Sequence, residues 1–240
     1  MINNLNEYLI GFALGTRFRA NFSIEDQLGK ILDTILYSHN SYFGPQVFPK
    51  VGGKGGQKIM YNPVTGDRLR IDNSNFILEI QFGDDVGLKK SKYDEILNNF
   101  YKQIIHGVMS KFKIQQIVRI GIVNRYLFPL NDLAESFVDK TIRKTLEGVN
   151  DINLSFSKII PVPEALIKRD ANDWSKAIFN IIKKEDTDEI FMTADYQLYY
   201  SPFLENAQQI KLPPFFKAAQ EFIQHGWQGL AGAVGRESPS

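Results

Sequence analysis

The sequence predicts an α+β fold, a mainly antiparallel β-sheet with helices packed on one side. Two observations predict it. Several segments alternate apolar and polar residues with period two, as strands with one buried face do, and the segments between them place apolar residues at helical spacing. We expect a single domain over residues 1–225, and we also consider two ferredoxin-like halves, 1–128 and 129–225.

The segment Gln116–Phe128 is the strongest strand of the chain, because it has high β preference and almost no turn-forming residues. Alternate side chains of a strand point to opposite faces. Ile120 and Ile122 then belong to an apolar face, and Arg119 and Arg125 belong to a mixed one. We expect this strand at the centre of the sheet, with one face against helices and the other partly open.

The remaining elements follow from apolar spacing, capping residues and turn residues. They are a strand over 10–22, a helix from 23 to about 40, a loop over 41–66, a hairpin of strands 68–72 and 76–82, a helix over 91–111, a helix capped by Asn131, a strand over 152–162, a short helix over 174–183, a strand over 189–200, and a last helix from Pro213 to about His225. The glycine-rich residues 226–240 are expected to form a flexible tail.

Composition excludes several classes of protein. The 240 residues carry a net charge of +1 and contain no cysteine. A disulfide framework, thiolate metal ligands and a cysteine nucleophile are therefore excluded. The first residues lack the basic region of a signal peptide, and no segment is apolar for long enough to span a bilayer, so we expect a soluble, cytoplasmic protein.

The central strand contains R-I-G-I-V-N-R, from Arg119 to Arg125. With one residue fewer before its N-R, this sequence resembles the R-h-G-h-x-x-N-R signature, h being apolar, of a sporadically distributed family of uncharacterised prokaryotic proteins of about this length. An early F-R-x-x-F strand at Phe18–Phe22 and a late strand with an acidic residue, Asp195, run in parallel with that family. The resemblance implies a fold and a setting in mobile or defence-type gene cassettes, and it implies no reaction.

Polar faces of the long strands supply the candidate residues for binding nucleic acid or a partner. These are Arg17, Arg19, Arg119, Arg125, Tyr199 and Tyr200. If the strands are neighbours, the arginines form a basic patch on which tyrosines could stack bases, as in sheet-based RNA binders. The alternative, which the sequence favours, is that the arginines pair across strands with Asp195, Glu79 or Glu189.

No catalytic constellation is apparent. His39, at the end of the first helix, is the alternative catalytic candidate, because a metal-independent endoribonuclease of the duplicated-ferredoxin type places a histidine base in a similar region. A structural helix-end histidine is favoured. The three histidines lack metal-ligand spacing, so no metal and no cofactor is expected. The glycine-rich segment 52–58 lacks the phosphate-binding patterns and favours a surface loop over an anion site.

Apolar faces without reactive residues favour a non-catalytic adaptor or accessory subunit over an enzyme. We expect a protein partner from a neighbouring gene of a prokaryotic defence or mobile-element cassette, such as a nuclease, an ATPase or a guide-loaded nuclease. The alternative is an RNA-binding module or a metal-independent endoribonuclease of the duplicated-ferredoxin type. Nucleic acid is thus the second kind of partner considered, and no membrane partner is expected.

Overall fold

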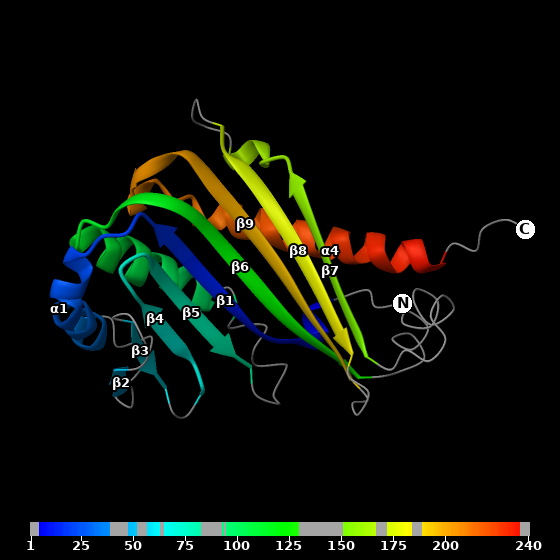
Figure 1. Ribbon diagram of the computed structural model, residues 1–240, viewed down its shortest axis with the longest axis horizontal. Helices are drawn as coiled ribbons and strands as arrows, with labels where there is room; N and C mark the ends of the chain where they lie inside the picture. Colours follow the sequence, from blue (N-terminus) through cyan, green and yellow to red (C-terminus); the bar gives the residue numbers. More distant parts are fainter. Residues whose placement is uncertain are drawn as a thin grey trace, which may run out of the picture.

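A nine-stranded antiparallel sheet forms the centre of the protein (Figure 1). The computed structural model describes residues 5–38, 48–51, 57–62, 65–82, 93, 95–129, 151–166, 172–183 and 189–235. Every neighbouring pair in the strand order β2-β3-β4-β5-β1-β6-β9-β8-β7 is antiparallel, which confirms the predicted α+β class. The strands are β1 (Leu9–Phe18), β2 (Phe48–Val51), β3 (Lys58–Tyr61), β4 (Arg68–Ile71), β5 (Asn75–Gln81), β6 (Gln115–Pro129), β7 (Ile152–Ile160), β8 (Trp174–Lys183) and β9 (Glu189–Asn206).

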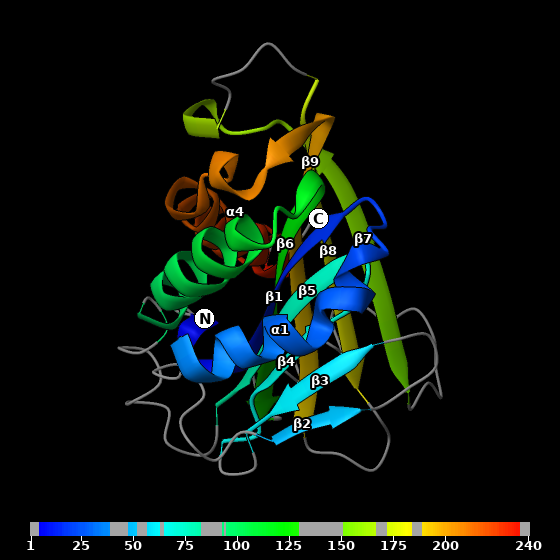
Figure 2. The same ribbon diagram turned by 90° about the vertical axis from the view of Figure 1, so that its left-hand side faces the viewer.

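The described helices cover one face of the sheet and leave the other face open (Figure 2). They are α1 (Ser23–Ser38), a helix over residues 95–111 that contains the π-helical section η2 (Phe100–Met109), and α4 (Leu212–Gly235). Short 3-10 turns form η1 (Leu5–Tyr8), η4 (Glu164–Leu166) and η5 (Ala207–Gln209). No described helix is long and apolar enough to cross a membrane.

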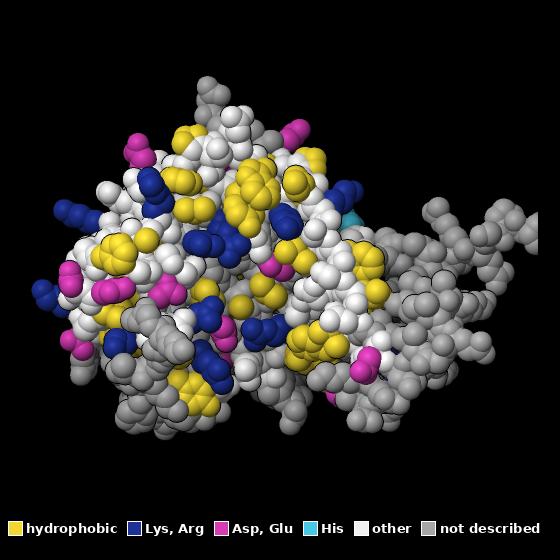
Figure 3. All heavy atoms as spheres, viewed as in Figure 1, with side chains coloured by type: hydrophobic (Ala, Val, Ile, Leu, Met, Phe, Trp, Pro, Cys, Tyr) yellow, Lys and Arg dark blue, Asp and Glu magenta, His cyan; other side chains and the backbone are white. Residues whose placement is uncertain are grey.

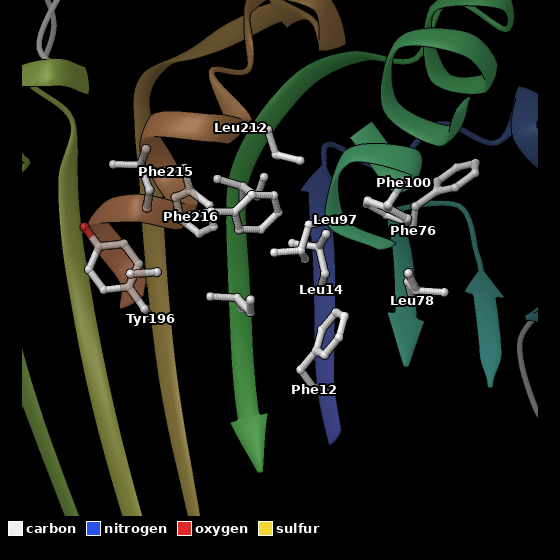
Figure 4. Close-up of a cluster of buried hydrophobic side chains, with 14 of the residues drawn as sticks. Phe12, Leu14, Phe76, Leu78, Leu97, Phe100, Tyr196, Leu212, Phe215 and Phe216 are labelled. Carbon is white, nitrogen blue, oxygen red and sulfur yellow. The ribbon is translucent and has the colours of Figure 1, made fainter. Parts of the chain in front are cut away.

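The hydrophobic core fills the space between the sheet and these helices (Figure 4). Phe12 of β1 and Phe76 of β5 are fully buried there, in one cluster with Phe100 of η2 and Phe215 of α4. Removing each such side chain from water contributes roughly 1.5–3 kcal/mol. One face of the sheet is therefore committed to packing against the described helices.

Apart from β2 and β3, the first half of the chain follows the order β-α-β-β-α-β, and the four strands concerned lie in the order β4-β5-β1-β6. This is a ferredoxin-like arrangement, which β2 and β3 extend beyond β4. The second half differs, because β7, β8 and β9 pair in sequence as a meander that joins the first half through β6. Among the described residues, the ferredoxin-like arrangement is thus seen once.

The prediction of a short helix over 174–183 is wrong, because this segment is the strand β8. Its even-numbered and odd-numbered positions both contain apolar residues, so apolar spacing alone does not distinguish a helix from a strand here. The predicted loop over 41–66 is also partly wrong, since it contains the hairpin strands β2 and β3. These strands are only four residues each, and ladder bonds to β4 extend the sheet through them.

The last helix, α4, continues ten residues beyond the predicted end at His225 and reaches Gly235. Gly226 explains part of this extension. A Cβ atom at that position would lie 2.8 Å from Cζ of Phe179 in β8, so the glycine lets the helix approach the sheet closely. Residues 236–240 of the predicted tail, and the helix predicted after Asn131, lie outside the described residues.

Candidate ligand-binding face

Side chains on the open face form rows across the sheet, because antiparallel pairing places partner residues side by side. We call one of these rows the arginine row. Each of its members is the Cα partner of the next, so residues far apart in the sequence become neighbours. The arginine row consists of Asn75 of β5, Arg17 of β1, Arg119 of β6, Tyr199 of β9 and Trp174 of β8.

Arg17 and Arg119 lie directly opposite each other at the centre of this row. Like charges in this position repel and destabilise a sheet. Among the described residues neither guanidinium forms a salt bridge, in contrast to the expected pairing with carboxylates on adjacent strands. The sheet therefore presents two adjacent positive charges that no described carboxylate neutralises by direct contact.

Arg119 is held by neutral partners. Its Nη1 donates to Oε1 of Gln197 at 2.8 Å and to the hydroxyl of Tyr199 at 3.1 Å. Nε2 of Gln197 in turn donates to Oδ2 of Asp195. Because a carboxylate only accepts hydrogen bonds, this contact orients the Gln197 amide with its oxygen toward Arg119. Asp195 thus acts on Arg119 through Gln197.

The Asp195 carboxyl is largely withdrawn from solvent. Burial raises its pKa above the ordinary value, and the hydrogen bond from Gln197 and the charges of Arg119 and Lys176 oppose this shift only in part. Its Oδ1 is buried and has no hydrogen-bond partner among the described residues. Burial of the ionised carboxylate therefore destabilises the folded protein, and its hydrogen bond with Gln197 offsets only part of this desolvation penalty.

Two aromatic rings continue the arginine row. Trp174 and Tyr199 stack with ring centroids 3.9 Å apart and planes 1° apart. The guanidinium carbon of Arg119 lies 5.7 Å from the centre of the Tyr199 ring, on the neighbouring strand. Rings that stack across two adjacent strands stand upright on the sheet, so they form a wall at one end of the row. Trp174 remains 38% exposed.

A pit of about 130 Å³ opens beside the arginine row. Its floor lies where Gly15 of β1 pairs with Gly121 of β6, because neither residue raises a side chain above the sheet. Side chains on β5, β1, β6 and β9 surround this floor. Arg17 and Arg119 stand at one end, Ala13, Val123 and Asp195 at the other, and Ile77 and Gln197 at the flanks.

Among the described residues, the strands present more basic than acidic side chains on the open face. Figure 3 shows Lys and Arg side chains gathered near its middle, next to hydrophobic ones. Strand register places Glu79, Asp195 and Glu189 on this face as its acidic members. The basic members are Arg17, Arg68, Arg70, Arg119, Arg125 and Lys176.

The predicted candidates divide between two faces. Arg125 lies on the open face, where it pairs with Gly11 and Thr193 further along β6. Arg19 follows the end of β1 and lies over the ring of Phe203, 5.7 Å from its centre, outside the row. Tyr200 is buried on the helix side, because successive residues of β9 alternate and Tyr199 takes the open face. His39 lies outside the described residues.

Sequence reasoning missed Gln197, Trp174 and Gly15 as members of this face. Trp174 was hidden because its segment was assigned to a helix. The glycines gave a usable signal, since a glycine inside a strand often marks a position where something approaches the backbone. Gln197 had no signal of its own, because its role depends on its neighbours in β6 and β9.

A scan against protein-family models finds no match to this chain, and a search of curated proteins finds none either. The family resemblance of the central strand therefore stays a prediction. No group of three or more metal-ligating side chains occurs among the residues that the structure describes. The pit combines two guanidinium groups and an amide, which suit recognition of an anion, with one carboxyl, which opposes it.

Proposed function

We propose that the protein is a non-catalytic RNA-binding module that holds single-stranded RNA on the open face of its sheet. The arginine row is the observation that carries this proposal. It places two guanidinium groups that form no salt bridge among the described residues next to an upright pair of aromatic rings. Single-stranded RNA offers phosphates for the first and unpaired bases for the second.

Base stacking and phosphate neutralisation each contribute enough free energy to support binding of RNA. Each base that stacks on an aromatic side chain contributes about 1–3 kcal/mol, and each phosphate that a cation neutralises adds a salt-dependent term. The open face has guanidinium groups and aromatic rings within one row, whereas helices cover the other face of the sheet (Figure 2). Binding is therefore expected on one side of the sheet.

Fluorescence anisotropy with a labelled, unstructured RNA oligonucleotide at several salt concentrations tests the proposal. We expect binding that weakens as salt rises, because neutralised phosphates release counterions. Arg17→Ala and Arg119→Ala are each expected to weaken binding and to make the logarithmic salt slope shallower by about 0.7.

Lys217→Ala is the matched control, because Lys217 is an exposed cation on α4, the helix side of the molecule. It removes one positive charge without touching the open face. Equal losses of affinity in Lys217→Ala and Arg17→Ala would contradict the proposal, since net charge alone would then explain binding. Absence of RNA binding by the wild-type protein would also reject it.

Cleavage of the RNA distinguishes the endoribonuclease alternative from a binding module. A binding module leaves structured RNA intact after long incubation. Cleavage that disappears in His39→Ala would instead support an enzyme with His39 as its base. Cleavage that persists in the variant would discard the role of His39.

The free edge at β7 favours a second candidate function, that of an accessory subunit for a protein partner. β7 is the last strand of the sheet and pairs only with β8 among the described strands. Phe156 and Ile159 on this strand are 43% and 69% exposed. An exposed strand edge with apolar side chains can pair with a strand from another chain. The proposed partner is the product of a neighbouring gene in a defence or mobile-element cassette.

Copurification from cells that express the neighbouring genes tests this second function. Ile159→Lys is expected to abolish capture of the partner, because it places a charge on the free edge. Phe22→Lys is a suitable control, since Phe22 is also 69% exposed but lies away from β7, between β1 and α1. Recovery of no partner by the wild-type protein would argue against the accessory role.

A further inference from the structure

We propose that the pit beside the arginine row binds a terminal phosphate group of single-stranded RNA, with Arg17 and Arg119 as its anion-binding residues. This inference rests on the proposed function and makes it more specific. The open face as a whole suits a chain of phosphates, whereas the pit suits one compact group that enters it from outside.

The shape of the pit favours a chain end over the interior of a chain. Its glycine floor is enclosed along the strands by the two arginines on one side and by Val123 and Asp195 on the other. Ile77 and Gln197 close the two remaining sides. A phosphodiester inside a chain would need an exit on both sides, but a terminal phosphate needs only one opening.

The volume of the pit agrees with a tetrahedral anion. It measures about 130 Å³, several times the ~10–15 Å³ that a cavity needs to hold one water molecule. A compact group of a few heavy atoms, such as a phosphate, therefore fits. The pit exists because two glycines face each other across β1 and β6; a Cβ at Gly15 would lie 3.1 Å from Cγ1 of Ile77, and one at Gly121 would lie 3.3 Å from Cγ of Gln197.

The donors are arranged for an anion with more than one oxygen. Nη1 of Arg119 is occupied by Gln197 and Tyr199, so its Nη2 and Nε remain for a ligand. Arg17 is exposed and has no hydrogen-bond or ion-pair partner among the described residues. Guanidinium groups bind phosphate oxygens in pairs, and a dianion relieves the repulsion between two opposed arginines.

Two other groups at the rim have different roles. The amide nitrogen of Asn75 is already held by Asp72 and Ser74, so Asn75 forms a wall and is not needed as a donor. Asp195 lies at the end away from the arginines and opposes an anion. It also holds Gln197, which positions Arg119, so Asp195 is a positioning residue.

The test compares three versions of one short, unstructured RNA, with a 5′-phosphate, with a 3′-phosphate, or with hydroxyl groups at both ends. Anisotropy with the full chain gives the ratio of affinities between phosphorylated and hydroxyl RNA. We expect a ratio of about ten or more for one of the two phosphorylated ends, since hydrogen bonds to charged groups are the strong ones.

Variants locate the effect in the pit. Arg17→Ala and Gly121→Val are both expected to bring the ratio close to one, the first by removing a donor and the second by filling the pit. Arg17 makes no described contact that folding requires, so it stays informative if the glycine variant is unstable. Arg125→Ala is the control, because it removes a charge on the same face outside the pit and should lower both affinities without changing the ratio.

The outcomes separate this inference from the proposed function. Binding of hydroxyl RNA with a wild-type ratio near one overturns the terminal-phosphate site alone, whereas no binding of any RNA overturns both. A ratio that Arg17→Ala leaves unchanged also overturns the site. A nucleoside monophosphate or a phosphoserine peptide that binds as tightly as the phosphorylated RNA would overturn the assignment to an RNA end.

Discussion

Asn124 donates a hydrogen bond of 3.0 Å from its Nδ2 to the hydroxyl of Tyr126, two residues further along β6 and inside the core. Its Oδ1 accepts a hydrogen bond of 3.3 Å from the hydroxyl of Tyr93. All three side chains are buried, and burial raises the pKa of the Tyr126 phenol well above its ordinary value. The asparagine of the central strand sequence is thus a polar link between the sheet and the helical side of the core.

Asn124→Ala should lower the free energy of unfolding by about 2–4 kcal/mol, because it leaves two buried hydroxyl groups without this partner. Tyr126→Phe removes only one of the two hydrogen bonds and should cost about 0.5–1.5 kcal/mol. Urea unfolding followed by circular dichroism measures both values. Equal effects of the two substitutions would show that the amide does not bridge the two hydroxyls.

Gly11→Ala should destabilise the protein by about 1–3 kcal/mol. A Cβ at Gly11 would lie 2.5 Å from the carbonyl oxygen of Ile80, and backbone atoms in a paired strand cannot move aside easily. Gly29→Ala is the matched control, since nothing lies within 4 Å of its added Cβ on α1. That substitution should stabilise the protein by roughly 0.5–1 kcal/mol through helix propensity. Thermal unfolding of both variants checks the opposite signs.

Asp195→Asn should make the protein more stable relative to wild type as the pH rises. The folded state raises the pKa of Asp195 above 3.8, so the folded protein binds this proton more tightly than the unfolded chain does. The free energy of unfolding of the wild type therefore falls as the pH rises from near 3.8 through the raised pKa. The variant has no carboxyl at this position, so it does not show this decrease. Unfolding free energies of both proteins across this range measure the difference, and a difference that stays constant with pH would contradict the expectation.

The same substitution has an expected consequence for binding. Removing the negative charge at the far end of the pit should tighten binding of RNA that carries the preferred terminal phosphate. The hydroxyl form should change less, because its phosphates lie outside the pit. Anisotropy titrations of the two RNA forms provide this comparison. A larger gain for hydroxyl RNA would place the influence of Asp195 outside the pit.

Trp174 should report RNA binding through its fluorescence. The chain has two tryptophans, of which Trp174 is 38% exposed on the open face and Trp227 is 7% exposed on the helix side. Single-stranded RNA is expected to quench Trp174 by stacking near it, and Trp174→Phe should remove most of the change. Trp227→Phe should retain it. The reverse result would place RNA on the helix side and reject the proposed face.

Much of the fold could be predicted because it is encoded locally. Alternation along β1 and β6 predicted which residues face the helices, helical spacing predicted α1, and proline at the first turn predicted the first half of α4. β8 escaped prediction because both of its faces carry apolar residues, which removes the period of two. The end of α4 was also missed, since Gly226 suggests a flexible tail until its contact with Phe179 is known.

The candidate site, like the fold, could be predicted only in part from the sequence. The sequence by itself determined that Arg17, Arg119 and Tyr199 have polar strand positions, because the direction of a side chain in a strand depends only on parity. Only the tertiary structure decided that Arg17 and Arg119 are opposite, that Gly15 and Gly121 form one floor, and that Trp174 joins the row. These relationships depend on strand order and register, which are set by long-range pairing and core packing, and no local pattern contains them.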